Sequence, residues 1–328
     1  MTTPADAVSQ LDWRPYALPM RNRFRGITVR EGMVALGPAG WGEFSPFADY
    51  DDAESATWLA AALEAAFEGW PAPVRDRVPV NVTIPAVDPE RAAEIVAASG
   101  GCTTAKVKVA EPGQAEVDDE ARVEAVRAAL GPAGRIRIDV NGLWDHDTAV
   151  RRIPVIDRAA GGLEYVEQPC AAVEDLAAVR RRVDVPIAAD ESIRRAEDPM
   201  RVAALEAADI AIVKVQPLGG VRAGLRIAEA IGLPVVVSSA LESSVGIAAG
   251  VALAAALPEL PHACGLATTQ MFHHDLTDPS LRPVEGALPV SRPEPTAELL
   301  ERARPDDEVA ARWHERLAAV DAARRVRA

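Results

Sequence analysis

The sequence has few cysteines and no long apolar run. Cys102, Cys170 and Cys264 are widely spaced and form no CxxC pair, so neither a disulfide framework nor a zinc site is indicated. The most apolar helical candidate, residues 247–257, is about half as long as the roughly 20 residues that a membrane-spanning helix needs. The first 15 residues lack the pattern of a secretory signal. We therefore expect a cytoplasmic protein with reduced, buried thiols and no membrane partner.

The sequence also lacks an excess of positive charge: its 49 acidic residues outnumber its 35 basic ones, and the formal net charge is −14. A surface of this sign repels the phosphate backbone of nucleic acids as well as anionic membranes. We therefore expect no nucleic-acid partner, and an anionic small molecule would need its own cluster of positive side chains. We also expect a monomer rather than a homo-oligomer.

Short runs rich in Val, Ile and Ala recur along the chain from about residue 79, and segments of helical periodicity separate them. The predicted strands are 79–84, 105–109, 135–140, 163–168, 185–190, 210–215, 233–238 and, from a weaker pattern, 262–267. Parallel strands joined by helices close most naturally into a barrel. The sequence therefore predicts a (β/α)7β TIM-like barrel over residues 77–290.

The flanking segments predict two further parts of the α/β fold. Residues 1–76 are expected to form an α+β capping domain, with a hairpin over 27–44 and a helix over 54–70. Residues 291–328 are expected to form a C-terminal helical segment, because its apolar residues repeat with helical spacing. We expect this segment to pack on the barrel exterior or on the capping domain.

Lysine is the scarcest charged residue type. Of the 35 basic residues only Lys106, Lys108 and Lys214 are lysines, and all three fall in predicted strands. Arginine stays protonated at every relevant pH, whereas a desolvated lysine can lose its proton and act as a base. The pattern favours a catalytic role. The alternative is that these lysines only fill the barrel interior with ion pairs.

Acidic residues end three consecutive predicted strands, at Asp139, Glu167 and Asp190. In a barrel the strand C-termini converge on one mouth, so these carboxylates become neighbours. A hard divalent cation such as Mg²⁺ relieves their repulsion, and the lack of His or Cys at equivalent positions weighs against zinc or iron. One such acid alone would more often cap a helix, but three together predict a Mg²⁺ site, in which Mn²⁺ could substitute.

The motifs KVK (106–108), DVN (139–141), EQP (167–169), DES (190–192) and KVQP (214–217) occur in this order along the chain. In this respect the chain resembles the enolase superfamily, and specifically its muconate-lactonizing-type branch, nearly from end to end. In that superfamily a lysine base works with Mg²⁺. The resemblance implies that Asp139, Glu167 and Asp190 bind the ion, that Lys108 is the base and that Lys214 acts from the opposite face. The supporting residues that it implies are Lys106, Asn141, Gln168 and Glu191.

Three further stretches, RNRFRG (21–26), WGEFSPF (41–47) and SSALESSVG (238–246), resemble the o-succinylbenzoate synthases of actinobacteria. The activity implied is a lyase reaction, the syn-dehydration of 2-succinyl-6-hydroxy-2,4-cyclohexadiene-1-carboxylate to o-succinylbenzoate in menaquinone biosynthesis. Lys108 would remove the proton and return it to the departing hydroxyl, and the ammonium of Lys214 would stabilise the enediolate. No organic cofactor is expected.

A dicarboxylate substrate needs binding groups besides the metal. The candidates are Arg21, Arg23 and Arg25, in a probable loop that could cover the barrel mouth, and Ser239, Ser243 and Ser244, at or after the seventh strand. The alternative for the arginines is a solvated loop. For Ser243 and Ser244 it is capping of the following helix.

Other functions use the same scaffold. Lysines on both faces are also what an N-acylamino acid racemase or another epimerase requires. Dipeptide epimerases of the superfamily carry a DxD motif at the end of the eighth strand, and HACGLATTQ (262–270) has none. A noncatalytic binding barrel is disfavoured, because such a barrel has no reason to keep lysine where arginine is otherwise preferred.

Overall fold

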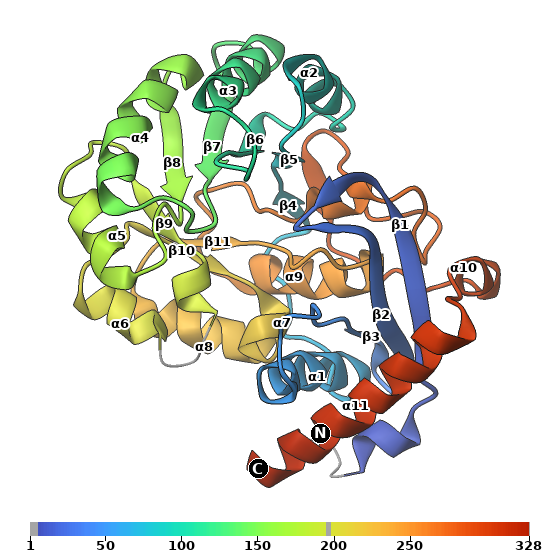
Figure 1. Ribbon diagram of the computed structural model, residues 1–328. Helices are drawn as coiled ribbons and strands as arrows, with labels where there is room; N and C mark the ends of the chain where they lie inside the picture. The colour runs from blue at the N-terminus through green and yellow to red at the C-terminus, as the bar shows by residue number, and fades with distance from the viewer. Residues whose placement is uncertain (1–5, 195–197, 328) are drawn as a thin grey trace.

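The computed structural model describes residues 6–194 and 198–327. An α/β barrel forms the larger part, and a smaller α+β unit lies against it together with the C-terminal helix (Figure 1). Two large apolar cores correspond to these parts. The α/β barrel with an N-terminal cap that the sequence predicts is confirmed.

Seven parallel strands are hydrogen-bonded in chain order. They are β5 (Val82–Ile84), β6 (Thr104–Lys108), β7 (Arg135–Asp139), β8 (Leu163–Glu167), β9 (Ile187–Ala189), β10 (Ile210–Val213) and β11 (Val235–Val237). The weak eighth strand is reduced to Cys264 and Gly265, which bridge in parallel to Val80 and Ser238. These two bridges join the edges of the sheet and close the barrel.

Helices connect the strands and cover the outside of the barrel (Figure 1). They are α2 (Pro89–Ala97), α3 (Glu116–Leu130), α4 (His146–Ala160), α5 (Val173–Arg180), α6 (Asp198–Ala204), α7 (Val215–Leu218), α8 (Val221–Ile231) and α9 (Ser244–Ala256). α9 contains most of the apolar run at 247–257 and is buried almost throughout. No helix in the described ranges is long and apolar enough to cross a membrane.

Strand alternation separates the barrel interior from the layer between strands and helices. On β6, Ala105 and Val107 join the outer apolar core, so Lys106 and Lys108 point inward. Inward-facing side chains of the other strands form a small apolar cluster below the lysines, made of Tyr165, Ala188, Ile210, Ile212 and Val236. A second set of buried polar contacts inside the barrel involves Arg137, which pairs with Glu164 and donates to Asn81.

The capping unit contains an antiparallel sheet of β1 (Arg14–Phe24), β2 (Ile27–Gly37) and β3 (Gly40–Phe44), covered by α1 (Asp52–Phe67). The predicted hairpin and helix are therefore present. Gly42 lets helix and sheet approach closely, because a Cβ there would lie 2.2 Å from the carbonyl oxygen of Ala62. The prediction of a loop at residues 21–26 was wrong, since β1 extends to Phe24 and only Arg25 and Gly26 form the turn.

Short elements complete the fold. These are the 3-10 helices η1 (Ala7–Gln10), η2 (Glu191–Ile193) and η3 (Ala267–Met271), the pair β4 (Arg77–Pro79) and β12 (Ala287–Pro289), and the helices α10 (Ala297–Arg302) and α11 (Asp307–Arg327). α11 lies on the capping unit: Trp313, Leu317 and Val320 belong to its apolar core. Arg316 donates hydrogen bonds to the carbonyl oxygens of Pro46, Phe47 and Tyr50.

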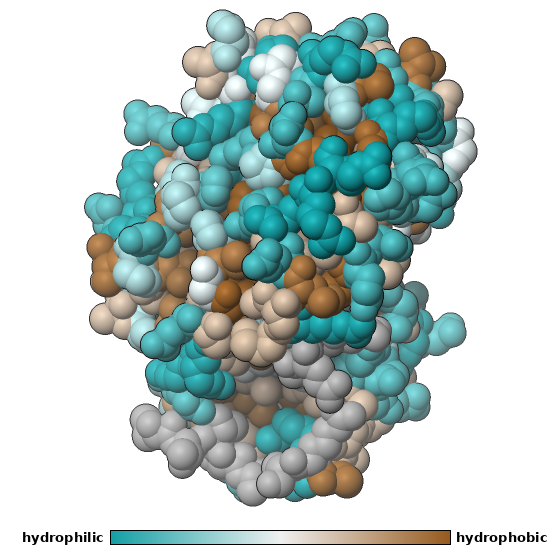
Figure 2. All heavy atoms as spheres, turned by 90° about the vertical axis from the view of Figure 1, so that its left-hand side faces the viewer, coloured by the Kyte–Doolittle hydropathy of each residue, from teal (hydrophilic) through white to brown (hydrophobic). Residues whose placement is uncertain are grey.

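On the face shown in Figure 2, hydrophilic side chains cover most of the area and apolar ones interrupt them in small groups. Such scattered apolar side chains are normal on a globular protein.

We predict that Leu317→Ala lowers the free energy of unfolding by roughly 2–5 kcal/mol, since it leaves a cavity in the capping core. Leu36→Ala is the matched control, because Leu36 is 55% exposed and Leu317 is 4% exposed. The control should cost no more than about 0.5 kcal/mol. Urea denaturation of both variants measures the difference, and equal costs would contradict the anchoring of α11 in this core.

Candidate active site

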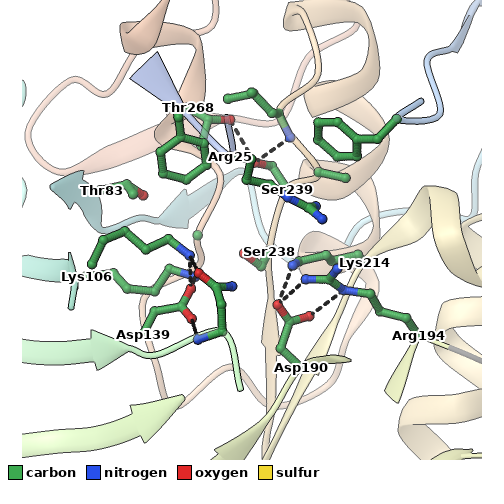
Figure 3. A pocket seen from close by; sticks show the side chains of 17 residues that line it. Arg25, Thr83, Lys106, Asp139, Asp190, Arg194, Lys214, Ser238, Ser239 and Thr268 are labelled. Atoms are coloured by element: carbon green, nitrogen blue, oxygen red, sulfur yellow. Dashed lines mark hydrogen bonds and ion pairs between the residues drawn. The ribbon is translucent and has the colours of Figure 1, made fainter. Parts of the chain in front are cut away.

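A small enclosed cavity lies at the C-terminal ends of the barrel strands (Figure 3). It is lined by Phe24, Arg25, Phe47, Thr83, Lys106, Lys108, Asp139, Asn141, Asp190, Arg194, Lys214, Ser238, Ser239, Ala240, Leu241, Gly265 and Thr268. Its volume is about 30 Å³, which is room for a few water molecules. Barrel strands and the tip of the β1–β2 hairpin thus enclose the same space.

On one side of the cavity two lysines of β6 meet two carboxylates. Lys106 Nζ lies 2.9 Å from Glu167 Oε1 and 3.0 Å from Asp139 Oδ2. Lys108 Nζ lies 2.6 Å from the same Asp139 oxygen. Strand register produces this arrangement, because Asp139 stands opposite both Lys108 and Glu167 on its two neighbouring strands.

On the other side Asp190 is held by two cations (Figure 3). Lys214 Nζ lies 2.5 Å from Asp190 Oδ2. Arg194 Nη2 lies 2.6 Å from the same oxygen, and its Nε donates to Oδ1 at 3.1 Å. Asp190 and Lys214 each stand one residue beyond the end of their strand. The structure therefore places the three predicted lysines, Asp139 and Asp190 on the wall of one cavity. Glu167 does not line the cavity but contacts Lys106.

Asn141 and Glu191 connect the two sides. Asn141 Oδ1 accepts a hydrogen bond of 2.5 Å from Lys108 Nζ, and its Nδ2 donates to Glu191 Oε1 at 3.1 Å. Glu191 Oε1 also accepts from Arg194 at 3.0 Å. Asn141 has a φ of 51°, in the left-handed region that asparagine adopts more readily than most residues. This turn directs the side-chain amide of Asn141 toward Lys108, the predicted base.

Gln168 has a different supporting role. Its Nε2 donates to the carbonyl oxygen of Cys170 and to Ser192 Oγ, and its Oε1 accepts from the backbone N–H of Asp190 at 2.9 Å. The side chain therefore fixes the backbone that carries Asp190 and lies away from the cavity. Such outer contacts orient the groups that bind a ligand.

Burial and neighbouring charges shift the pKa values of this cluster. Burial alone would lower the pKa of Lys106, but Asp139 and Glu167 outweigh it and raise that pKa well above its usual range. The lysines likewise hold the pKa of Asp139 low against the effect of burial. Burial, reinforced by the charge of Asp139, raises the pKa of Glu167 to about 8. Burial and then Arg194 lower the pKa of Lys214 to about 8.

The predicted substrate-binding residues divide into two groups. Arg25 and Ser239 line the cavity, and Ser239 Oγ lies 2.8 Å from Thr268 Oγ1. Arg21 and Arg23 stand on β1 and are not among the described residues that line the cavity. Arg21 instead donates to the carbonyl oxygen of Phe272 at 3.0 Å, which ties the hairpin to the barrel.

Ser243 and Ser244 are completely buried at the start of α9 and do not line the cavity. Ser243 caps the helix by accepting from the N–H of Val245, and its hydroxyl donates to Glu43. The hydroxyl of Ser244 donates to Asp275. Ser243 therefore caps α9, as the alternative interpretation of the sequence proposed. The contacts of Ser243 and Ser244 do not support the prediction that they bind substrate.

Sequence reasoning missed two residues that shape the site. Glu43 of β3 accepts from Tyr16 at 2.7 Å and from the N–H of Gly246 at 3.0 Å, so a capping-unit carboxylate sits at the N-terminus of α9. Arg194, which contacts Asp190, was also not considered. Glu43 lies in the WGEFSPF stretch and Arg194 two residues after DES, so the signal for both is their place within or beside a recognisable motif.

A divalent cation fits this set of donors. Among the described residues no group of three or more His, Cys, Asp or Glu side chains stands in place to hold a metal. Lysines and Arg194 contact the three predicted acids. Yet Glu167 favours its protonated form despite direct contact with Lys106, and Glu191 Oε2 is buried without a hydrogen-bond partner. Both observations indicate that the cations now in contact with these carboxyl groups do not fully compensate for their burial.

Two family models match the chain. Residues 16–66 match the model described as enolase N-terminal domain-like, and residues 89–295 match enolase C-terminal domain-like. The structure of a muconate lactonizing enzyme from Pseudomonas fluorescens aligns with a TM-score of 0.77 at 21% identity, covering 90% of this chain and 98% of that one. The latter likeness concerns the fold alone. Fold and matched models define a protein of the enolase superfamily.

Relatives of higher sequence identity indicate which family within the superfamily the chain belongs to. An o-succinylbenzoate synthase from Thermobifida fusca (strain YX) is 67% identical over 310 residues, which are 94% of this chain and 96% of the relative. An o-succinylbenzoate synthase from Mycolicibacterium smegmatis is 60% identical over 274 residues, or 84% of each chain. The chain therefore belongs to the o-succinylbenzoate synthase family, as its motifs indicated.

A pH prediction follows from Glu242, which lies behind the cavity wall. Both its oxygens lie within 3.0 Å of the N–H of Ala240, and burial, followed by the charge of Glu43, raises its pKa to about 7. Because the unfolded carboxyl titrates near 4.5, the folded state binds the extra proton between these values. The contribution of Glu242 to the wild-type stability should therefore fall as pH rises from about 4.5 to about 7.

Glu242→Gln keeps an oxygen for Ala240 but cannot ionise. Its unfolding free energy relative to wild type should therefore increase across this interval, as measured by urea denaturation at several pH values. Glu229→Gln, at an exposed position, supplies the baseline for removing one carboxylate. A variant-minus-wild-type difference that stays constant between pH 4.5 and 7 would show that Glu242 does not titrate as described.

Proposed function

We propose that the protein dehydrates 2-succinyl-6-hydroxy-2,4-cyclohexadiene-1-carboxylate to o-succinylbenzoate, as a cytoplasmic enzyme of menaquinone biosynthesis. The observation that carries the proposal is that Lys108 and Lys214 line one enclosed cavity from different strands, beside carboxylates at consecutive strand ends. Relatives that are 60–67% identical and named o-succinylbenzoate synthase support the choice of reaction. The three free thiols, all buried, fit a reducing compartment.

Asp139, Glu167 and Asp190 are proposed to hold Mg²⁺, or Mn²⁺ in its place. When bound, the ion would neutralise the negative charge that develops on the substrate carboxylate as the adjacent proton is removed. The lysines and Arg194 that now contact these acids then have to give up part of their contacts. The donor set consists of oxygen atoms only, which suits a hard cation.

Lys108 is proposed to be the base and then the acid. Its neutral amine takes the proton next to the substrate carboxylate, a carbon–carbon double bond forms, and the hydroxyl leaves from the neighbouring carbon. The resulting ammonium returns the proton to that hydroxyl, so that one water is released and the lysine is restored. Asn141 Oδ1, 2.5 Å from Lys108 Nζ, is placed to hold the amine in position through this cycle.

Lys214 acts from the other side of the cavity, where its ammonium would stabilise the negative charge of the planar intermediate. Asp190, 2.5 Å from its Nζ, holds this lysine at the cavity wall. Lys106 contacts both Asp139 and Glu167 and remains charged. We propose that it positions these carboxylates and takes no proton itself.

The succinyl arm needs more room than the enclosed cavity offers, since small-molecule sites usually measure ~300–1,000 Å³. A second, more open cavity of about 950 Å³ shares Arg25, Asn141 and Arg194 with the first. We propose that the hairpin tip at Phe24 and Arg25 moves to admit the substrate. Arg25 and Ser239 are then the candidates for contact with the second carboxylate.

Racemisation of N-acylamino acids is the second candidate function. It requires a base on each face of the substrate, and the pKa of Lys214 near 8 would leave a useful fraction of its amine neutral at mildly alkaline pH. Dehydration and racemisation use the same lysines, so only assays of both substrates separate the two.

We predict that purified protein with Mg²⁺ removes the absorbance of the cyclohexadiene substrate, and that EDTA abolishes this turnover. Restoring Mg²⁺ should restore it, since the carboxylates alone cannot stabilise the developing charge. A parallel racemisation assay on N-succinylamino acids is the comparison. Racemisation without dehydration would reassign the function, and EDTA-resistant turnover would remove the metal from it.

We predict that Lys108→Ala lowers the dehydration rate by at least about 100-fold, the usual contribution of a general base. Lys108→Arg should lose a similar factor, because arginine keeps the charge but cannot release its proton. Circular dichroism and urea denaturation check that both variants fold. Either variant retaining a tenth of the wild-type rate would exclude Lys108 as the base.

A further inference from the structure

Arg194 is the one cation of the site that no sequence motif accounts for. It directly follows η2, two residues after the DES motif, and its side chain is only 10% exposed. The guanidinium binds both carboxylate oxygens of Asp190, and it also contacts Glu191 Oε1 at 3.0 Å. Its remaining nitrogen lies 3.4 Å from the Tyr50 hydroxyl of the capping unit. A bidentate pair of this kind is among the stronger ionic contacts in proteins.

The cluster contains as many basic side chains as acidic ones. The cations are Lys106, Lys108, Lys214 and Arg194. The carboxylates that they contact are Asp139, Glu167, Asp190 and Glu191. A divalent ion would add two positive charges to a nearly solvent-free space, where like charges repel strongly. Binding therefore requires that a cation withdraw.

Arg194 is the cation best placed to withdraw. Lys106 and Lys108 stand on β6, and Lys214 directly follows β10, so the barrel sheet fixes their backbones. Arg194 follows a short 3-10 turn outside the sheet. It also lines the cavity of about 950 Å³, next to Asp49 and Tyr50 of the capping unit. A rotation of its long side chain can therefore carry the guanidinium away from Asp190 without moving a strand.

We propose that Arg194 is the counter-cation of the metal-free site, which holds Asp190 in place and gives it up when the divalent ion binds. The proposal rests on the metal site described under the proposed function. Arg194 is then a positioning residue that sets the affinity for the ion, because each binding event has to break its contacts with Asp190.

The test is the affinity of the purified protein for Mn²⁺ alone, measured by titration calorimetry and by the electron paramagnetic resonance signal of free Mn²⁺. Arg194→Gln removes the competing charge and should bind Mn²⁺ about tenfold more tightly than wild type. Arg194→Lys keeps a charge and should stay within about threefold of wild type. A residue with only a structural role would weaken binding when replaced.

Arg201→Gln is the matched control. Arg201 lines the same larger cavity but pairs with Glu174 and not with Asp190, so its loss should leave the Mn²⁺ affinity unchanged. Asp139→Asn tests the underlying site and should abolish tight binding. If wild type binds no Mn²⁺, or Asp139→Asn binds it normally, the proposed metal site fails. If wild type and Asp139→Asn behave as expected but Arg194→Gln binds equally or more weakly, only the role of Arg194 is overturned.

Discussion

Asp139, Glu167 and Asp190 are each 1% exposed, and a carboxylate in such surroundings is strongly destabilising unless a positive charge lies against it. Each of the three is contacted by at least one lysine at 3.0 Å or less. This requirement explains why positively charged side chains lie at these positions. The lysines that stabilise the folded barrel mouth therefore include the proposed base, Lys108.

The capping unit depends on a second buried carboxylate. Glu43 accepts hydrogen bonds from Tyr16, Ser45 and the first turn of α9. From the neighbouring strand, Arg30 donates to the carbonyl oxygen of Leu241 at 2.9 Å. Ala240 and Leu241, which line the cavity, are thus held through their carbonyl oxygens by Arg30 of the capping unit. The upper wall of the site is assembled when the two parts of the chain pack together, so neither part alone contains it.

The sequence predicted the barrel and the cluster of lysines and acids, because strand alternation and the convergence of strand ends are general properties of this architecture. It did not predict β1, where Pro15 and Pro19 lower the strand signal and are tolerated because β1 is an edge strand. It also placed Ser243 and Ser244 near the substrate. Their actual partners, Glu43 and Asp275, are 200 and 31 residues away along the chain, and no local pattern reveals such contacts.

The structure also bears on why lysine stands at only three positions. Ion pairing inside the barrel is not the explanation by itself, because Arg137 on β7 points into the same barrel, is fully buried, and pairs with Glu164 at 2.7 Å. Arg194 pairs with Asp190 in the same way at the mouth. This chain therefore uses arginine for buried ion pairs directly beside the lysines. What arginine cannot offer is a proton that leaves near neutral pH, and Lys214, with its pKa near 8, has that property. At Lys214 the choice of lysine thus provides a group that can change its protonation state, whereas Lys106, which stays charged between Asp139 and Glu167, is accounted for by ion pairing.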